Sequence, residues 1–168
     1  MARLLPLRKD IDVGSLPPTE VSTYEAHPDD PDLLRWDAEL SKRHRPLDHA
    51  FWIREEQAQA LWFKLGDTTV GYAYVRPGAR QLWYPAAITI GPIGAHTAEQ
   101  AEQCVVAAVH RALSLGDAVR IDTPGPHPAL HTLLQAGFQI VDMDMFMAGA
   151  KVPRIDGLCY VGSGGTLF

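Results

Sequence analysis

The spacing of apolar residues changes repeatedly along this chain, and these changes constrain the fold more than any other feature of the sequence. After Asp30-Pro31, an N-cap followed by a first-turn proline, apolar residues recur at helical spacing. From Ala60 they alternate instead, on either side of a turn at Gly66-Asp67, which predicts a β-hairpin. Helical spacing returns after the capping box Thr97-Ala98-Glu99-Gln100 and ends at Gly116. This order predicts an α/β protein with helices packed on a mixed sheet.

The remaining segments extend this pattern. Beside the helix that ends at Gly116, helices are expected over about 31–44, from Pro46 onward, and from His127-Pro128 to Gly137. Strands are expected over 21–25, 61–65, 70–75, 81–90, 118–122 and 138–147.

Length and composition indicate one domain. The chain has 168 residues, of which 46% are hydrophobic and 21% charged, and a chain of this size can fold without disulfides or metals. We interpret residues 1–168 as a single domain with an irregular N-terminal segment over 1–19 and a C-terminal tail over 151–168. The tail is too apolar for a free linker, so it is expected to pack on its own sheet or on a second copy of the chain in a homodimer.

Charge and cysteine usage argue against several classes of protein. The net charge of −5 argues against nucleic-acid binding, and the basic run over 42–45 is explained by the end of a helix. No apolar run approaches the ~20 residues that span a bilayer, and the first residues lack a secretory signal. Cys104 and Cys159 form no metal or disulfide spacing, so a cytoplasmic protein with reduced thiols is expected.

Three stretches, in this order, resemble the GNAT superfamily of acyl-CoA-dependent N-acetyltransferases. They are Val70-Gly71-Tyr72-Ala73-Tyr74, Ile90-Gly91-Pro92-Ile93-Gly94-Ala95 and Pro128-Ala129-Leu130-His131-Thr132-Leu133-Leu134-Gln135-Ala136-Gly137-Phe138. The resemblance covers about residues 20–148. It implies a mixed central sheet, with an antiparallel meander and one splayed parallel pair of strands, and helices on both faces. It also implies acetyl-CoA as co-substrate and no metal.

In that family the two parallel strands leave a gap that holds acetyl-CoA. Free backbone amides of the first strand bind the pantetheine arm, and the loop before the long helix binds the pyrophosphate at the helix N-terminus. Carried over residue by residue, the resemblance assigns this donor site to Ile90, Gly91, Ile93, Gly94, Ala95, His96 and Thr97. The facing strand would supply Arg120, Ile121, Asp122 and Thr123. The gap between the two strands must be open for the donor to bind.

The sequence departs from the family pattern in two places. The loop is short and lacks the usual Arg or Gln, and Gly91 and Gly94 have an alternative interpretation as a bulge and a tight strand-to-helix turn. Many family members place a Tyr four residues before the helix-ending glycine as the general acid that protonates the departing thiolate, and this chain has Leu133 there. The proton for the departing thiolate must then come from another group or from water.

Two side chains are candidates for the general base. Asp122 lies on the facing strand, and His131 lies on the last helix near the expected thioester. The alternatives are a strand-end carboxylate that accepts backbone hydrogen bonds and a half-buried helix residue. His127 and His131 are four apart on one helix, but without a third ligand nearby we expect no metal there.

Aromatic residues concentrate in the second helix and the meander, which form the acceptor side in GNAT-like folds. We expect Trp52, Tyr72, Tyr74 and Tyr84 to line the substrate cleft, or else to pack in the core. Tyr72 and Tyr74 share one face of their strand, so either both line the cleft or both pack in the core.

These observations together predict acetyl transfer from acetyl-CoA to a primary amine, by direct attack of the amine on the thioester. The acceptor would be a small molecule or a peptide. One alternative is a catalytically inactive GNAT-fold module that binds a ligand or a protein. A second alternative is an α/β dimerisation domain with no acyl-CoA site.

Overall fold

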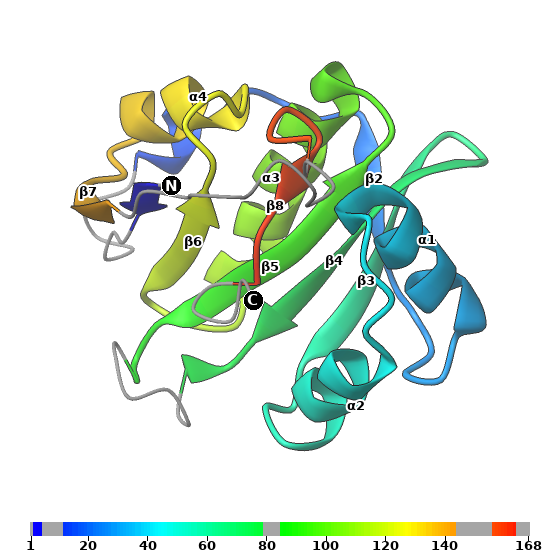
Figure 1. The fold of residues 1–168 in the computed structure, drawn as a ribbon. Helices are drawn as coiled ribbons and strands as arrows, with labels where there is room; N and C mark the ends of the chain where they lie inside the picture. The colour runs from blue at the N-terminus through cyan, green and yellow to red at the C-terminus, as the bar shows by residue number, and fades with distance from the viewer. Residues whose placement is uncertain (1, 5–11, 79–84, 144–155, 164–168) are drawn as a thin grey trace, which may run out of the picture.

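The computed structural model describes residues 2–4, 12–78, 85–143 and 156–163, and one eight-stranded mixed sheet runs through these segments (Figure 1). The strands are β1 (Ala2–Leu4), β2 (Val21–Glu25), β3 (Gln59–Leu65), β4 (Thr68–Arg76), β5 (Ile88–Ala95), β6 (Val119–Thr123), β7 (Ile140–Met143) and β8 (Tyr160–Val161). Their order is β2-β3-β4-β5-β6-β1-β7, and β8 pairs with β5 off this path. The β5–β6 pair is parallel and its neighbours are antiparallel, which confirms the expected mixed sheet.

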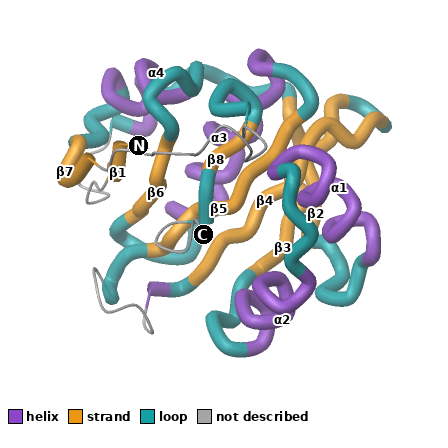
Figure 2. The backbone as a smooth tube through the Cα atoms, viewed as in Figure 1, coloured by secondary structure: helices purple, strands orange, loops and turns teal. Residues whose placement is uncertain are grey.

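Helices cover both faces of the sheet. One face carries α1 (Pro31–Ser41) and α2 (Pro46–Arg54), and the other carries α3 (Ala98–Leu113) and α4 (Ala129–Gln135) (Figures 1 and 2). A short 3-10 helix, η2 (Val13–Ser15), precedes β2. β4 shows the two-sided arrangement, because Ala73 packs in the larger cluster with α3 whereas Tyr72 packs in the smaller cluster with α1 and α2. Among the described residues no helix has the length and apolar character needed to cross a membrane.

Local capping explains where the helices begin and end. The Asp30 side chain accepts a hydrogen bond from the Asp32 amide at the start of α1, and Thr97 Oγ1 accepts one from the Gln100 amide at 3.2 Å at the start of α3. Lys42 adopts a left-handed conformation with φ of 61°, so α1 ends at Ser41 rather than near residue 44.

Two strands differ from the sequence-based expectation. β5 begins at Ile88 and continues to Ala95, so Gly94 and Ala95 belong to the strand rather than to the loop. Residues 81–84 and 144–147, expected in strands, lie outside the described residues. Within the N-terminal segment expected to be irregular, Ala2–Leu4 forms β1 between β6 and β7. Its three residues are too few to show an alternating pattern, and the strands that pair with it are remote in sequence.

A bulge shapes β5. Ile93 pairs with Ala73 and Ile90 pairs with Val75, so the two residues Gly91 and Pro92 lie opposite the single residue Tyr74. Gly91 has φ of 132°, a conformation that favours glycine, which confirms the bulge interpretation of this residue.

Beyond the bulge, β5 and β6 no longer pair. The parallel ladder joins Ile88–Ile90 to Val119–Ile121 only, and β8 pairs antiparallel with β5 at Ile93 and Gly94. The expected gap therefore forms, but it is not open, because the chain's own C-terminal segment fills it. Residues 156–163 of the tail pack on their own sheet, as one of the two expectations stated.

Candidate functional site

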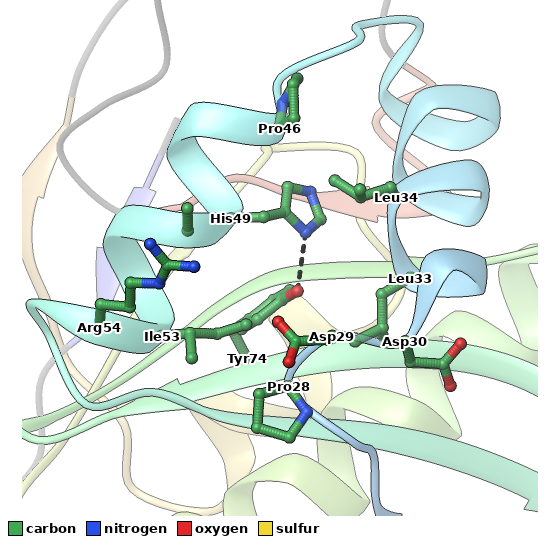
Figure 3. Close-up of a pocket in the computed structure, with 11 residues that line it drawn as sticks. Pro28, Asp29, Asp30, Leu33, Leu34, Pro46, His49, Ile53, Arg54 and Tyr74 are labelled. Atoms are coloured by element: carbon green, nitrogen blue, oxygen red, sulfur yellow. Dashed lines mark hydrogen bonds between the residues drawn. The ribbon is translucent and has the colours of Figure 1, made fainter.

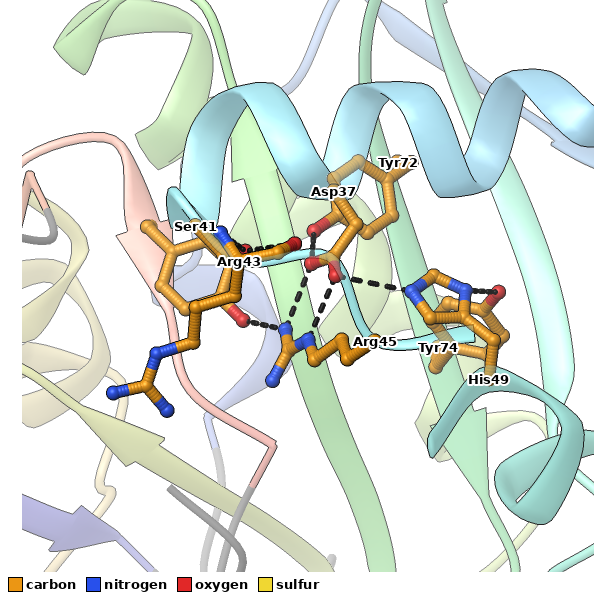
Figure 4. Close-up of polar contacts among 8 residues, drawn as sticks. Asp37, Ser41, Arg43, Arg45, His49, Tyr72 and Tyr74 are labelled. Carbon is orange, nitrogen blue, oxygen red and sulfur yellow. Dashed lines mark hydrogen bonds and ion pairs between the residues drawn. The ribbon is translucent and has the colours of Figure 1, made fainter. Parts of the chain in front are cut away.

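A buried carboxylate organises the polar side chains between the sheet and helices α1 and α2. Asp37 is 1% exposed, and its carboxylate accepts hydrogen bonds from Arg45 Nε and Nη2, both at 2.7 Å (Figure 4). The carboxylate also accepts a hydrogen bond from the Tyr72 hydroxyl, and its Oδ2 lies 3.0 Å from His49 Nε2. Burial alone would raise the pKa of Asp37, but hydrogen bonds from Arg45, His49 and Tyr72 outweigh it and lower the pKa to about 2.

The ionised Asp37 orients the His49 ring. Because this carboxylate can only accept, Nε2 of His49 carries a proton and donates it to Asp37 at 3.0 Å, and Nδ1 lies 2.7 Å from the Tyr74 hydroxyl. In the neutral imidazole with this tautomer, Nδ1 is the acceptor of the Tyr74 hydroxyl. Burial and the charge of Asp37 both raise the pKa of Tyr74, so its hydroxyl stays protonated and able to donate. Tyr74, His49 and Asp37 thus form a buried chain of hydrogen bonds, which we call the relay.

Each member of this relay is placed by the local fold. Leu33, Asp37 and Ser41 are the buried residues of α1, and their four-residue spacing puts them on one face of the helix. Tyr72 and Tyr74 lie two apart on β4 and therefore point to the same face of the sheet. His49 lies on α2, and Arg45 is the N-cap residue of that helix.

A cavity of about 190 Å³ opens between α1 and α2, next to the relay (Figure 3). Its apolar lining includes Leu33 and Ile53, and Asp29 and Arg54 contribute charge. Tyr74 and His49 line the same cavity, and Figure 3 shows their hydrogen bond between the two helices. The cavity therefore combines an apolar wall, charged groups and one end of the Tyr74–His49–Asp37 chain of hydrogen bonds.

The C-terminal segment reaches the same network from the edge of β5. The Ala95 amide donates to the Cys159 carbonyl at 3.0 Å, and the Tyr160 hydroxyl accepts a hydrogen bond from Arg45 Nη2. Val161 is 0% exposed and packs in the larger core cluster. The Ser163 carbonyl accepts a hydrogen bond from Arg76 Nη2.

The donor-site residues expected from the resemblance lie on β5 and at its end. Residues 90–95 are buried, and the backbone near Ile93, Gly94 and Ala95 pairs with the C-terminal segment. Gly94 is not at a strand-to-helix turn, because β5 continues through it. His96 is exposed with its ring centroid 4.3 Å from that of Trp36, and Thr97 caps α3.

The two candidate bases lie apart. Asp122 is buried in β6 and forms an ion pair with Arg120 at 3.0 Å, whereas His131 is exposed on α4. Leu133 is 0% exposed in the larger core cluster, which gives this position a packing role. Within the described ranges, no three His, Cys, Asp or Glu side chains are grouped as a metal site would require.

The expected substrate-binding aromatics are largely buried. Trp52 of α2 packs with Tyr72 and Tyr74 of β4 in the smaller core cluster, and the ring centroids of Trp52 and Tyr74 are 5.2 Å apart. Of the three, Tyr74 lines the cavity. Tyr84 lies outside the described residues.

Sequence reasoning missed Asp37, Arg45, His49 and Tyr160. Asp37 carried a usable signal, since a charged residue four positions after Leu33 falls on the apolar face of α1. Arg45 belongs to the basic run expected at the end of a helix, yet its side chain is only 11% exposed and forms a bidentate pair with Asp37. Neither His49 nor Tyr160 belongs to a local motif that could have revealed its role.

Comparison with known proteins identifies the family of this chain. A family model described as an acetyltransferase (GNAT) domain matches residues 38–160, from the residue after Asp37 to the first residue of β8. No curated protein matches the sequence. A crystal structure of a functionally unknown conserved protein from Staphylococcus epidermidis ATCC 12228 is similar with a TM-score of 0.50 and 12% identity. The match covers 83% of this chain and 56% of that chain, so this chain spans about half of its length, and the likeness concerns the fold alone. With most of its length matched by that model, the chain belongs to the GNAT acetyltransferase domain family.

Proposed function

We propose that this chain is an N-acyltransferase that transfers an acetyl or other acyl group to a primary amine held in the cavity between α1 and α2. The observation that carries the proposal is the buried relay of Tyr74, His49 and Asp37, which begins at that cavity. Titratable groups that are buried and hydrogen-bonded beside a cavity are typical of sites that move protons. Membership of the GNAT family supports the same reaction class.

The cavity offers an amine both charge and apolar surface. Asp29 and Asp30 line it, and a carboxylate attracts the ammonium form of an amine. Asp30 already accepts hydrogen bonds from the Asp32 amide and from the Trp62 indole at 3.0 Å, so we assign Asp29 to the ammonium. Leu33 and Ile53 would contact an apolar substrate body.

The proton step uses groups that already contact one another. An ammonium must lose a proton before its nitrogen can attack. The Tyr74 oxygen would accept this proton while the hydroxyl proton of Tyr74 passes to His49 Nδ1. The resulting imidazolium lies between Tyr74 and Asp37, and the low pKa of Asp37, about 2, keeps that carboxylate charged at neutral pH.

An acyl-CoA would supply the acyl group as a thioester: the amine nitrogen forms the amide bond, the C–S bond breaks, and the departing thiolate takes a proton from water. The conformation described above does not fit this donor, because residues 159–163 occupy the edge of β5 that would bind it. The loop before α3 also offers neither an Arg nor a Gln. We therefore assign no donor contact in this conformation.

Release of free thiol from acetyl-CoA, measured against a panel of primary amines, tests the proposal. We expect amine-dependent release by the full chain and a loss of about 100-fold in kcat in Tyr74→Phe, which keeps the ring but removes the relay. Tyr24→Phe changes a half-exposed tyrosine on β2 and should keep the wild-type rate. Equal rates in Tyr74→Phe and wild type would contradict the relay. No amine-dependent release at all would contradict acyl transfer.

A second candidate is a catalytically inactive GNAT-fold module that binds a ligand or a protein. Two observations favour it: the C-terminal segment fills the donor edge, and Leu133 is buried where many family members have an acidic Tyr. Such a module would bind an amine in the α1–α2 cavity without releasing thiol from acetyl-CoA.

A further inference from the structure

We infer that the edge of β5 from Gly91 to Ala95 is a binding site for an extended chain, that residues 159–163 are its occupant, and that an acyl-thioester arm competes with them for it. The identity of the competitor rests on the proposed function. The occupied site itself does not, because it is defined by contacts within the chain.

The backbone of β5 lacks β6 as a partner along its second half. After Ile90 this strand no longer pairs with β6, so the backbone N–H and C=O groups along that edge need another hydrogen-bonding partner. The C-terminal segment supplies it: Ile93 pairs with Val161, Gly94 pairs with Tyr160, and the Ala95 amide donates to Cys159 at 3.0 Å. Strand addition of this kind recognises an extended chain through its main chain, whatever its side chains.

The side chains of the C-terminal segment fit against both faces of the sheet. Val161 enters the core on the α3 side, whereas Tyr160 reaches the network on the α1 side. Gly94 lies in register between Tyr72 and Tyr160. A Cβ atom on Gly94 would lie 2.6 Å from Tyr72 Cε1 and 2.7 Å from Leu40 Cδ1, so only glycine leaves room for these neighbours.

The Tyr160 side chain places an acceptor oxygen against Arg45. The Tyr160 hydroxyl accepts a hydrogen bond from Arg45 Nη2, while the same guanidinium binds Asp37. An acyl carbonyl oxygen is an acceptor of the same kind. When Tyr160 leaves, Arg45 would present a fixed cation beside the edge of β5, where charge develops on an attacked carbonyl.

The end of the segment is held by a separate contact. Arg76 is 1% exposed, donates to the Ser163 carbonyl and forms an ion pair with Glu56 at 2.6 Å. Gly91 lies against Gly162 so closely that a Cβ atom on Gly91 would overlap its carbonyl oxygen. The occupant is thus fixed at both ends of the β5 edge, and the competing arm must displace it completely.

A matched pair of full-length variants tests the inference. Val161→Asp places a charge in the core and should detach the segment. Leu158→Asp introduces the same charged side chain at a position that is 44% exposed. Two quantities are measured: hydrogen exchange of the Ala95 amide, and the affinity for acetyl-CoA by calorimetry. We expect exchange about tenfold faster and affinity about tenfold tighter in Val161→Asp, with wild-type behaviour in Leu158→Asp.

Two results would overturn the inference. Faster exchange with unchanged affinity would show that the segment does not compete with the donor. Unchanged exchange in a folded Val161→Asp variant would show that the segment is not held on β5 as described. If circular dichroism shows that Val161→Asp is unfolded, Tyr160→Phe decides: it removes only the hydroxyl, and we expect acetyl-CoA to bind a few-fold tighter. Unchanged affinity in Tyr160→Phe would likewise overturn the inference.

The same data separate this inference from the proposed function. Tighter binding of acetyl-CoA to Val161→Asp, without thiol release in the presence of any amine, would support the competition and contradict acyl transfer. Amine-dependent thiol release by the wild-type chain, together with equal acetyl-CoA affinity in wild type and in a Val161→Asp variant whose Ala95 amide exchanges faster, would contradict the competition and support acyl transfer.

Discussion

At the scale of single residues, Asp37 joins side chains from separate parts of the chain. It binds Arg45 from the turn before α2, His49 from α2 and Tyr72 from β4, and through Arg45 it is linked to Tyr160. A buried carboxylate is tolerated only when such partners satisfy it. Strand alternation predicted that Tyr72 and Tyr74 share a face, but no local pattern predicted that a carboxylate on α1 would meet them.

Replacing Asp37 by Asn should destabilise the protein strongly. The substitution leaves the Arg45 guanidinium without its counter-charge in a buried site, which should lower the free energy of unfolding by about 3–5 kcal/mol. Urea unfolding measures this change. Asp32→Asn, on the same helix in an exposed pair with Arg35, should cost about 1 kcal/mol or less. Equal losses in the two variants would argue against a special role of Asp37.

A second residue, His127, should make stability depend on pH. Burial lowers the pKa of His127 from 6.5 to about 4, so between these values the unfolded chain binds a proton that the folded chain does not. The free energy of unfolding should therefore fall as pH drops from 6.5 to 4, by up to about 1.4 kcal/mol per pH unit. The lowered pKa of Asp37 removes further stability only below pH 3.8.

Urea unfolding between pH 7.5 and pH 4 measures the His127 effect. His127→Gln should flatten the dependence, whereas His131→Gln, at an exposed position on α4, should retain it. A His127→Gln variant with the wild-type slope would assign the pH dependence to other groups.

At the scale of elements, β5 changes its pairing partner along its length. Its bulge at Gly91-Pro92 lies opposite Tyr74, and its outer half pairs with β8 instead of β6. The hairpin of β3 and β4 and the capped helix α3 were predictable, because their patterns are long and local. β1 and β8 were not, since two or three residues carry no periodicity and their partners are distant in sequence.

Gly94→Ala should disturb β5 and its neighbours. A methyl group there meets the Tyr72 ring and Leu40, so we expect a loss of about 1–3 kcal/mol in the free energy of unfolding. Gly125→Ala is the control, because a Cβ atom on Gly125 meets nothing within 4 Å. Thermal or urea unfolding compares the two. A loss no larger than that of the control would show that the Tyr72 side chain can move aside.

At the scale of the whole molecule, the order of helices and strands identified the family, and the match over residues 38–160 confirms it. The occupation of the β5 edge by the C-terminal segment could not be predicted from that order. It depends on where the tail returns to the sheet, and the sequence left packing on its own sheet and packing on a second copy as alternatives. The fold therefore combines a GNAT sheet and a cavity between α1 and α2 with a β5 edge that the chain's own C-terminal segment occupies.

A crystal structure of the full chain without added ligand tests this account most directly. We expect continuous density for residues 159–163 along β5, with the Cys159 carbonyl hydrogen-bonded to the Ala95 amide and the Tyr160 hydroxyl to Arg45. A structure in which solvent lines β5 from Gly91 to Ala95, with Tyr160 away from Arg45, would contradict it.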